Sequence, residues 1–345
     1  MPRCKFAVRS KVTCLNRMAR PNKHFQQQVP GIKELRTSSL SQLRSVVHRK
    51  LSRNSQALIT SGQFIAIMLI PALVVLVGLT VVPFFTSVWL SLTDYLLTSP
   101  PPRFIGITNY TDLLSSADFR IALWTSVLFT AGAVGLQTFV GVGIAVLLHH
   151  ETRLVPFLRT LYLIPLAITP VAALFTFRMM LNPGLGVTNY LIRQLGLPAQ
   201  DWLGSHTLAL LSLILVDTWQ WAPFTLLIAV GGLASLPQEP YEAAKIDGAN
   251  ALQTFLFITL PLLKPFLIIA VLFRSIDAFK TFDSIYVLTA GGPGVSTTTL
   301  NLYGYKQAIE FLSLGYGATV AIVIMLIMTV FANILVRFTS LDGTD

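Results

Sequence analysis

Long apolar runs recur through this chain and limit what it can fold into. Each run is at least as long as the roughly 20 helical residues that cross the hydrocarbon core of a bilayer. In lipid the backbone must satisfy its own hydrogen bonds, which favours helices. Charged residues are only 12% of the 345 residues. We therefore predict an all-α, polytopic membrane protein with six transmembrane helices, near residues 62–90, 121–149, 157–181, 206–232, 261–289 and 313–338.

The connections between these runs contain turn signals and one amphipathic pattern. Residues 110–119 have the spacing of a short amphipathic helix, and residues 182–205 are expected to form an external loop. The sequences Asn182-Pro-Gly-Leu-Gly and Gly291-Gly-Pro-Gly are typical of turns. The six helices and their connections form one membrane domain, residues 57–340, followed by a short tail at 341–345.

The first 56 residues are strongly basic. They contain thirteen of the 25 Lys and Arg residues and one acid, Glu34. Basic segments remain in the cytoplasm beside anionic lipid, so we expect a flexible cytoplasmic tail and, with six spans, both termini on the cytoplasmic side of the membrane. An organelle transit peptide and a true start at Met18 are alternatives. We predict no nucleic-acid partner.

The chain has no pattern that indicates catalysis. No Gly-x-x-x-x-Gly-Lys-[Ser/Thr] sequence is present, so we expect no ATP site of the P-loop type. Cys4 and Cys14 both lie in the basic tail, and the pair His149-His150, at a predicted helix end, reads as an interfacial cap. We therefore predict a non-enzymatic chain with no catalytic residues, no metal site and no cofactor of its own.

Charged and aromatic residues interrupt two of the apolar runs. In the fifth run, Arg274, Asp277, Ala278 and Thr281 fall on one helix face. They form either a polar stripe that contacts a solute or, with Lys280–Asp283, ion pairs that tie helices together. The same face spacing recurs in the fourth run, at Asp217, Gln220, Trp221 and Phe224. Aromatic faces beside carboxylate and amide groups suit a sugar or another polyol, while packing at the membrane interface is the alternative.

One short polar segment, residues 236–261, separates the fourth and fifth runs. Pro240 and Glu242 suit the first turn of a helix, and Gly248 suits its end. The fixed positions are Glu242-Ala-Ala, three residues, Gly248, nine residues, Ile258, one residue, and Leu260-Pro. This spacing resembles the EAA motif of ABC importer permeases. Phe104-Ile-Gly-Ile-Thr-Asn-Tyr and Phe282-Asp-Ser-Ile-Tyr-Val-Leu-Thr resemble further segments of the MalF-type carbohydrate permeases in that family.

The resemblance implies the fold of a type I ABC importer permease, a place in the bacterial inner membrane and a set of partners. These are a second, MalG-like permease subunit, two ATPase subunits that bind ATP and Mg²⁺, and a periplasmic or lipid-anchored solute-binding protein. It also implies that the 236–261 segment docks on an ATPase. The coupling residues would be Glu242, Ala243, Ala244, Asp247 and Gly248. The polar residues of the fourth and fifth runs would line the solute pathway.

The identity of the cargo remains open from the sequence. A disaccharide or oligosaccharide of the trehalose or maltose type fits the aromatic residues. Arg274 would suit the phosphate of glycerol 3-phosphate, whereas Asp277 beside it favours a neutral sugar. A secondary transporter that works alone and a non-transporting membrane scaffold are the alternatives from other classes.

Overall fold

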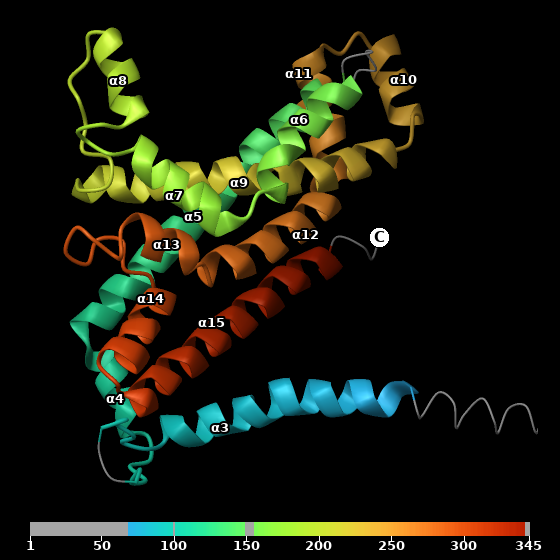
Figure 1. Ribbon diagram of the computed structural model, residues 1–345. Helices are drawn as coiled ribbons and strands as arrows, with labels where there is room; N and C mark the ends of the chain where they lie inside the picture. Colours follow the sequence, from blue (N-terminus) through green and yellow to red (C-terminus); the bar gives the residue numbers. More distant parts are fainter. Residues whose placement is uncertain (1–67, 99–100, 149–154, 342–345) are drawn as a thin grey trace, which may run out of the picture. The chain divides into compact units, whose positions relative to one another are not determined.

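The computed structural model describes residues 68–98, 101–148 and 155–341, with side chains up to residue 337 (Figure 1). Within these ranges the elements are helices, and extended pairing is limited to two isolated bridges, Thr93 with Phe104 and Leu96 with Ser313. The predicted all-α class is confirmed. The chain divides into two units, residues 1–81 and residues 82–345. All contacts described below lie within the second unit.

Five helices in the described ranges are long and apolar enough to cross a membrane. A bent pair of helices supplies a sixth crossing if the pair counts as one. The five are Met68–Ser91, Ala117–Leu147, His206–Ala234, Ala251–Phe279 and Leu314–Arg337. Met68–Ser91 contains the π-helix η2 (Val77–Val81) and the α-helix α3 (Val82–Ser91). These bounds agree with the predicted spans to within a few residues, except at the fifth span and at the start of the first, which falls outside the described residues.

Four long helices make the main contacts of the second unit. The helix α5 (Ala117–Leu147) packs along α9 (His206–Ala234), and α12 (Leu260–Phe279) packs on both. The helix α15 (Leu314–Leu341) contacts α3 and α12. Small residues permit the close approach of α5 to α9, because a Cβ atom at Gly141 would lie 2.7 Å from the Thr225 Cβ and 2.9 Å from the Ala222 carbonyl oxygen.

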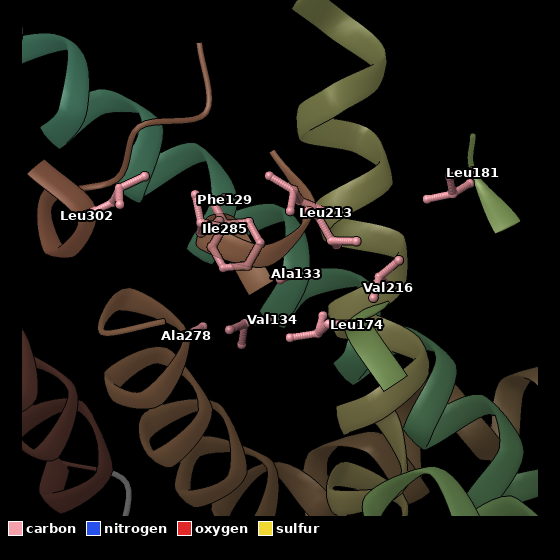
Figure 2. Close-up of a cluster of buried hydrophobic side chains, with 11 residues drawn as sticks. Phe129, Ala133, Val134, Leu174, Leu181, Leu213, Val216, Ala278, Ile285 and Leu302 are labelled. Atoms are coloured by element: carbon pink, nitrogen blue, oxygen red, sulfur yellow. The ribbon is translucent and has the colours of Figure 1, made fainter. Parts of the chain in front are cut away.

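The largest buried hydrophobic cluster joins α5, α9 and α12 to shorter helices (Figure 2). It contains Phe129, Ala133, Val134, Leu174, Leu181, Leu213, Val216, Ala278, Ile285, Leu288 and Leu302. A second cluster links α5 to α15 around Leu113 and Val320. A third links α5, α9 and α12 around Leu226 and Leu263.

The predicted third span is broken. It consists of α6 (Val155–Ala167) and α7 (Pro170–Met180), which meet at an angle of 93°. Thr169 between them has ψ 121°, because a residue that precedes proline is pushed out of the helical region. Hydropathy alone does not register this bend.

Two of the predicted connections also differ from expectation. The single helix predicted over residues 110–119 is wrong, because α4 (Thr108–Ser115) ends at Ser116, whose extended backbone begins α5. The Ser116 hydroxyl accepts a hydrogen bond from the Phe119 N–H at 3.4 Å. The segment 182–205, predicted as a loop, contains the helix α8 (Val187–Gln194).

The fifth span ends earlier than predicted. The helix α12 stops at Phe279, and a separate helix α13 (Asp283–Leu288) follows a three-residue break. Lys280 and Asp283 therefore do not share one helix, and the ion pair considered for them is not among the interactions of the described residues. After the turn at residues 291–294, the chain forms α14 (Leu300–Tyr305) and the π-helix η4 (Lys306–Glu310) before α15.

Several predictions fall outside the described residues. They concern the basic tail at 1–56 and its cysteines, the His149-His150 pair and the tail at 342–345.

The glycine at the α5–α9 contact provides a test of this packing. We expect Gly141→Ala to lower the stability of the protein by about 1–3 kcal/mol, because the added methyl group overlaps a backbone carbonyl. The control is Gly143→Ala, two residues along the same helix, where a Cβ atom meets nothing within 4 Å. Thermal unfolding in detergent measures both variants. Equal unfolding midpoints for Gly141→Ala and Gly143→Ala would contradict the packing.

Candidate functional site

The segment between α9 and α12 folds into two short helices. The first, α10 (Glu239–Ile246), has Pro240 and Glu242 in its first turn and Lys245 in its last turn, which suits the helix dipole. It ends at Gly248, whose φ of +74° favours glycine. The Ala249 N–H donates to the Ala244 carbonyl at 2.9 Å, and the Gly248 N–H donates to the Lys245 carbonyl at 3.3 Å. This is a Schellman C-cap.

The second helix of the segment continues directly into the membrane span. Asn250 begins α11 (Ala251–Thr254) with a capping box, in which Asn250 and Gln253 exchange two hydrogen bonds of 2.9 Å. The π-helix η3 (Phe255–Thr259) then leads into α12. Its wider turn comes just before Pro261, which cannot donate to the carbonyl four residues earlier. The Tyr241 hydroxyl donates to the Thr259 hydroxyl at 3.2 Å and so ties α10 to this continuous helix.

The five residues predicted to couple to an ATPase lie together on α10 and its C-terminal cap. Glu242, Ala243, Asp247 and Gly248 are exposed, whereas Ala244 is buried against the rest of the chain. Ile246, which the sequence reasoning did not select, is 87% exposed beside them. An apolar side chain exposed in a polar segment was the signal that could have identified it. The helix α10 and its cap therefore expose acidic, basic and apolar side chains to a partner, among them Glu242, Lys245 and Ile246.

The polar residues of the fourth and fifth spans meet around Arg274. Its Nη2 group donates to Asp217 Oδ2 of α9 at 2.9 Å, and its Nη1 group donates to the Asp277 carboxylate one turn along α12. Arg274 is 2% exposed and Asp217 4% exposed. A buried charge needs such partners, because removal from water without them is costly. The sequence leaves two interpretations of these residues open, a polar stripe that contacts a solute and ion pairs that tie helices together. The ion pairs are present, and the cavity described below shows that Asp217 and Asp277 also border a space for a solute.

Two further residues complete this polar network. Arg274 Nε donates to Gln137 Oε1 of α5 at 2.8 Å, and Gln137 Nε2 donates to Asp217 Oδ2 at 2.5 Å. The Trp221 ring covers the guanidinium, with 4.5 Å between the ring centroid and Arg274 Cζ. Three long helices are therefore held together by one arginine. Gln137, fully buried on α5, is a member that the sequence reasoning missed.

A cavity of about 300 Å³ lies beside the network. Its lining comes from α7, α9, the end of α12, the break after it and α13, and comprises Pro170, Leu174, Asp217, Gln220, Trp221, Asp277, Lys280, Thr281, Phe282, Asp283 and Ser284. The Ser284 hydroxyl is buried and has no hydrogen-bond partner among the described residues. A buried polar atom without a partner is uncommon in a folded protein and calls for an explanation.

The predicted pathway residues divide into two groups in the structure. Asp217, Gln220, Trp221, Asp277 and Thr281 line the cavity, and Arg274 lies directly behind them. Ala278 instead packs in the cluster of Figure 2, and the half-buried Phe224 is not part of the lining. Trp219, which the helical spacing directs away from this face, stacks edge-on with Phe177.

Removing the partner of the buried arginine tests the network. We expect Asp217→Asn to destabilise the protein by about 1–3 kcal/mol, because Arg274 loses its buried counter-ion from α9 and keeps only the half-exposed Asp277. Asp112→Asn, an exposed change on α4, serves as the control. Thermal unfolding in detergent, with the yield of folded protein, gives the comparison. If Asp217→Asn unfolded at the same temperature as Asp112→Asn, the network would not hold these helices.

The sequence is similar to those of several named transport permeases. The trehalose/maltose transport system permease protein MalF of Thermococcus litoralis is 37% identical over 260 residues, covering 75% of this chain and 87% of that protein. The sulfoquinovosyl glycerol transport system permease protein SmoG of Agrobacterium fabrum is 36% identical, covering 81% and 91%. The trehalose transport system permease protein SugA of Mycobacterium tuberculosis is 31% identical, covering 79% and 88%.

Structural comparison gives the same fold. A chain of a bacterial ABC transporter involved in the import of the acidic polysaccharide alginate superimposes with a TM-score of 0.73 at 18% identity, covering 83% of this chain and 98% of that chain. The family described as the inner membrane component of binding-protein-dependent transport systems matches residues 137–340, which include the polar network, the cavity and the α10 segment. The chain belongs to this family of ABC transporter permeases.

Proposed function

We propose that this chain is the permease subunit of an ATP-driven importer that moves a sugar inward across the bacterial inner membrane. Its working form contains a second permease subunit, two ATPase subunits that bind ATP and Mg²⁺, and a solute-binding protein on the outer side. The basic tail and both termini lie in the cytoplasm. Three sets of observations support these assignments: the α10 segment, the cavity and the relatives.

The α10 segment is the observation that carries the proposal. It exposes Glu242, Ala243 and Gly248 on a short helix between two membrane spans. The capping box at Asn250 and the bond from Tyr241 to Thr259 connect this helix to α12, which bears Arg274 and Asp277. A displacement of α10 by a partner would therefore be transmitted to the helix that borders the cavity. This connection is what coupling of ATP hydrolysis to transport requires.

Support for a sugar as cargo comes from the cavity and the named relatives. Trp221 and Phe282 provide aromatic surfaces, and Gln220 and Ser284 provide hydrogen-bonding groups. Aromatic rings pack against the C–H faces of a solute, and groups that both donate and accept hydrogen bonds suit its hydroxyl groups. Two relatives are named as permeases for trehalose, one of them also for maltose.

The proposal is tested by purifying the tagged chain in mild detergent, identifying its partners by mass spectrometry and measuring ATPase activity. We expect an ATPase subunit and a second permease subunit to co-purify. A chain that purifies alone, and that moves solute with a proton or sodium gradient in vesicles, would instead be a secondary transporter.

A charge reversal on α10 tests the coupling role directly. We expect Glu242→Lys to reduce uptake and retention of the ATPase subunit by at least about tenfold, because an interfacial charge is replaced by its opposite. The matched control is Glu239→Lys, the same charge change in the same exposed helical turn but outside the motif. Membrane insertion should be equal for both variants. Full uptake by a well-expressed Glu242→Lys variant would rule out the coupling role.

A further inference from the structure

The buried Arg274 behind the cavity wall is occupied by contacts within the protein. Each of the three nitrogen atoms of Arg274 donates to a protein group: Gln137, Asp277 and Asp217. The indole of Trp221 covers one face of the guanidinium. With 2% of its surface exposed, Arg274 is committed to the helix contacts. Arg274 is not among the residues that line the cavity, so an incoming phosphate or carboxylate does not meet its guanidinium directly.

The charged groups that line the cavity are three carboxylates and one ammonium group, that of Lys280. Three carboxylates, Asp217, Asp277 and Asp283, line the wall. Two cationic side chains oppose these three carboxylates: Arg274 lies behind the wall and Lys280 lies within it. The site therefore has one net negative charge. The Asp277 side chain is 53% exposed, and only one of its oxygens is bonded to Arg274. A carboxylate oxygen accepts hydrogen bonds from solute hydroxyl groups and repels solute anions.

Neutral hydrogen-bonding groups complete the lining. The Ser284 hydroxyl is buried without a partner, and the Gln220 amide makes no hydrogen bond to the described residues. Gln220 provides both a donor and an acceptor, and Ser284 provides the same in one group. Each of these groups can donate a hydrogen bond to a solute hydroxyl group or accept one from it, and neither adds charge to the cavity.

We propose that this cavity accepts uncharged, hydroxyl-rich solutes and rejects anions such as phosphate esters, with Asp277 as the residue that determines this selectivity. The inference rests on the proposed function and narrows its cargo. Asp277 acts in two ways, because it occupies the Nη1 group of Arg274 and presents its own negative charge to the cavity. Glycerol 3-phosphate, which the sequence leaves open, is thereby excluded.

Equilibrium binding to the detergent-solubilised complex, purified with its partner permease and ATPase subunits but without the solute-binding protein, tests the inference. The probes are trehalose and trehalose 6-phosphate, and ligand-induced shifts of the unfolding midpoint over a concentration series give the dissociation constants. We expect the wild type to bind trehalose at least about tenfold more tightly than its phosphate. In Asp277→Asn, the affinity for the phosphate should rise by at least about tenfold, because a donor of Arg274 is released and the net negative charge is lost.

Two further variants serve as controls. Asp277→Glu keeps the carboxylate and should retain the preference for the neutral sugar, which separates charge from local packing. Asp112→Asn removes an exposed carboxylate from α4 and should bind both probes as the wild type does. Asp277→Asn is expected to fold, because Asp217 still neutralises Arg274.

Several outcomes would overturn the inference. They are equal binding of both probes by the wild type, no gain in phosphate affinity in Asp277→Asn, and no binding of either probe by a complex that imports trehalose. ATP-driven uptake of an anionic solute by the wild type would also overturn it while leaving the importer function intact. If the complex takes up no carbohydrate and no anion, the proposed function itself fails.

Discussion

The buried Arg274 guanidinium is the constraint on which the rest of the membrane domain depends. An uncompensated charge among apolar helices is not tolerated, so α9 supplies Asp217 and α5 supplies Gln137. These bonds set the faces that the three helices turn toward one another. The same setting places Trp221 and Asp277 at the cavity and Val216 and Ala278 in the hydrophobic cluster. The residues that hold the three helices together therefore also determine the polarity of the solute site.

The sequence predicted the positions of the helices well where apolar length alone determines them. Apolar length located α5, α9 and α15 to within a few residues, because crossing a bilayer requires a minimum length. The breaks were harder to predict. The bend at Thr169 and the end of α12 at Phe279 depend on local backbone geometry and on the packing of α7 against α13, which hydropathy does not record.

The candidate site shows the same division between local and long-range signals. The cap at Gly248 was predictable because a helix end is encoded within a few neighbouring residues. Helical spacing placed Asp217 with Trp221 and Arg274 with Asp277. It did not reveal that Arg274 meets Asp217, 57 positions away, or Gln137, 137 positions away. Ser284 resembles any other serine until its lack of a partner is seen in the folded chain.

We propose that this permease moves its solute by energy supplied through α10. Uptake of radiolabelled trehalose into vesicles that contain the purified complex tests it most directly. With the solute-binding protein on the outside and ATP on the ATPase side, the account predicts accumulation of trehalose that stops when either is omitted and persists when ion gradients are dissipated. Accumulation by this chain alone, driven by a proton or sodium gradient without ATP, would contradict the account.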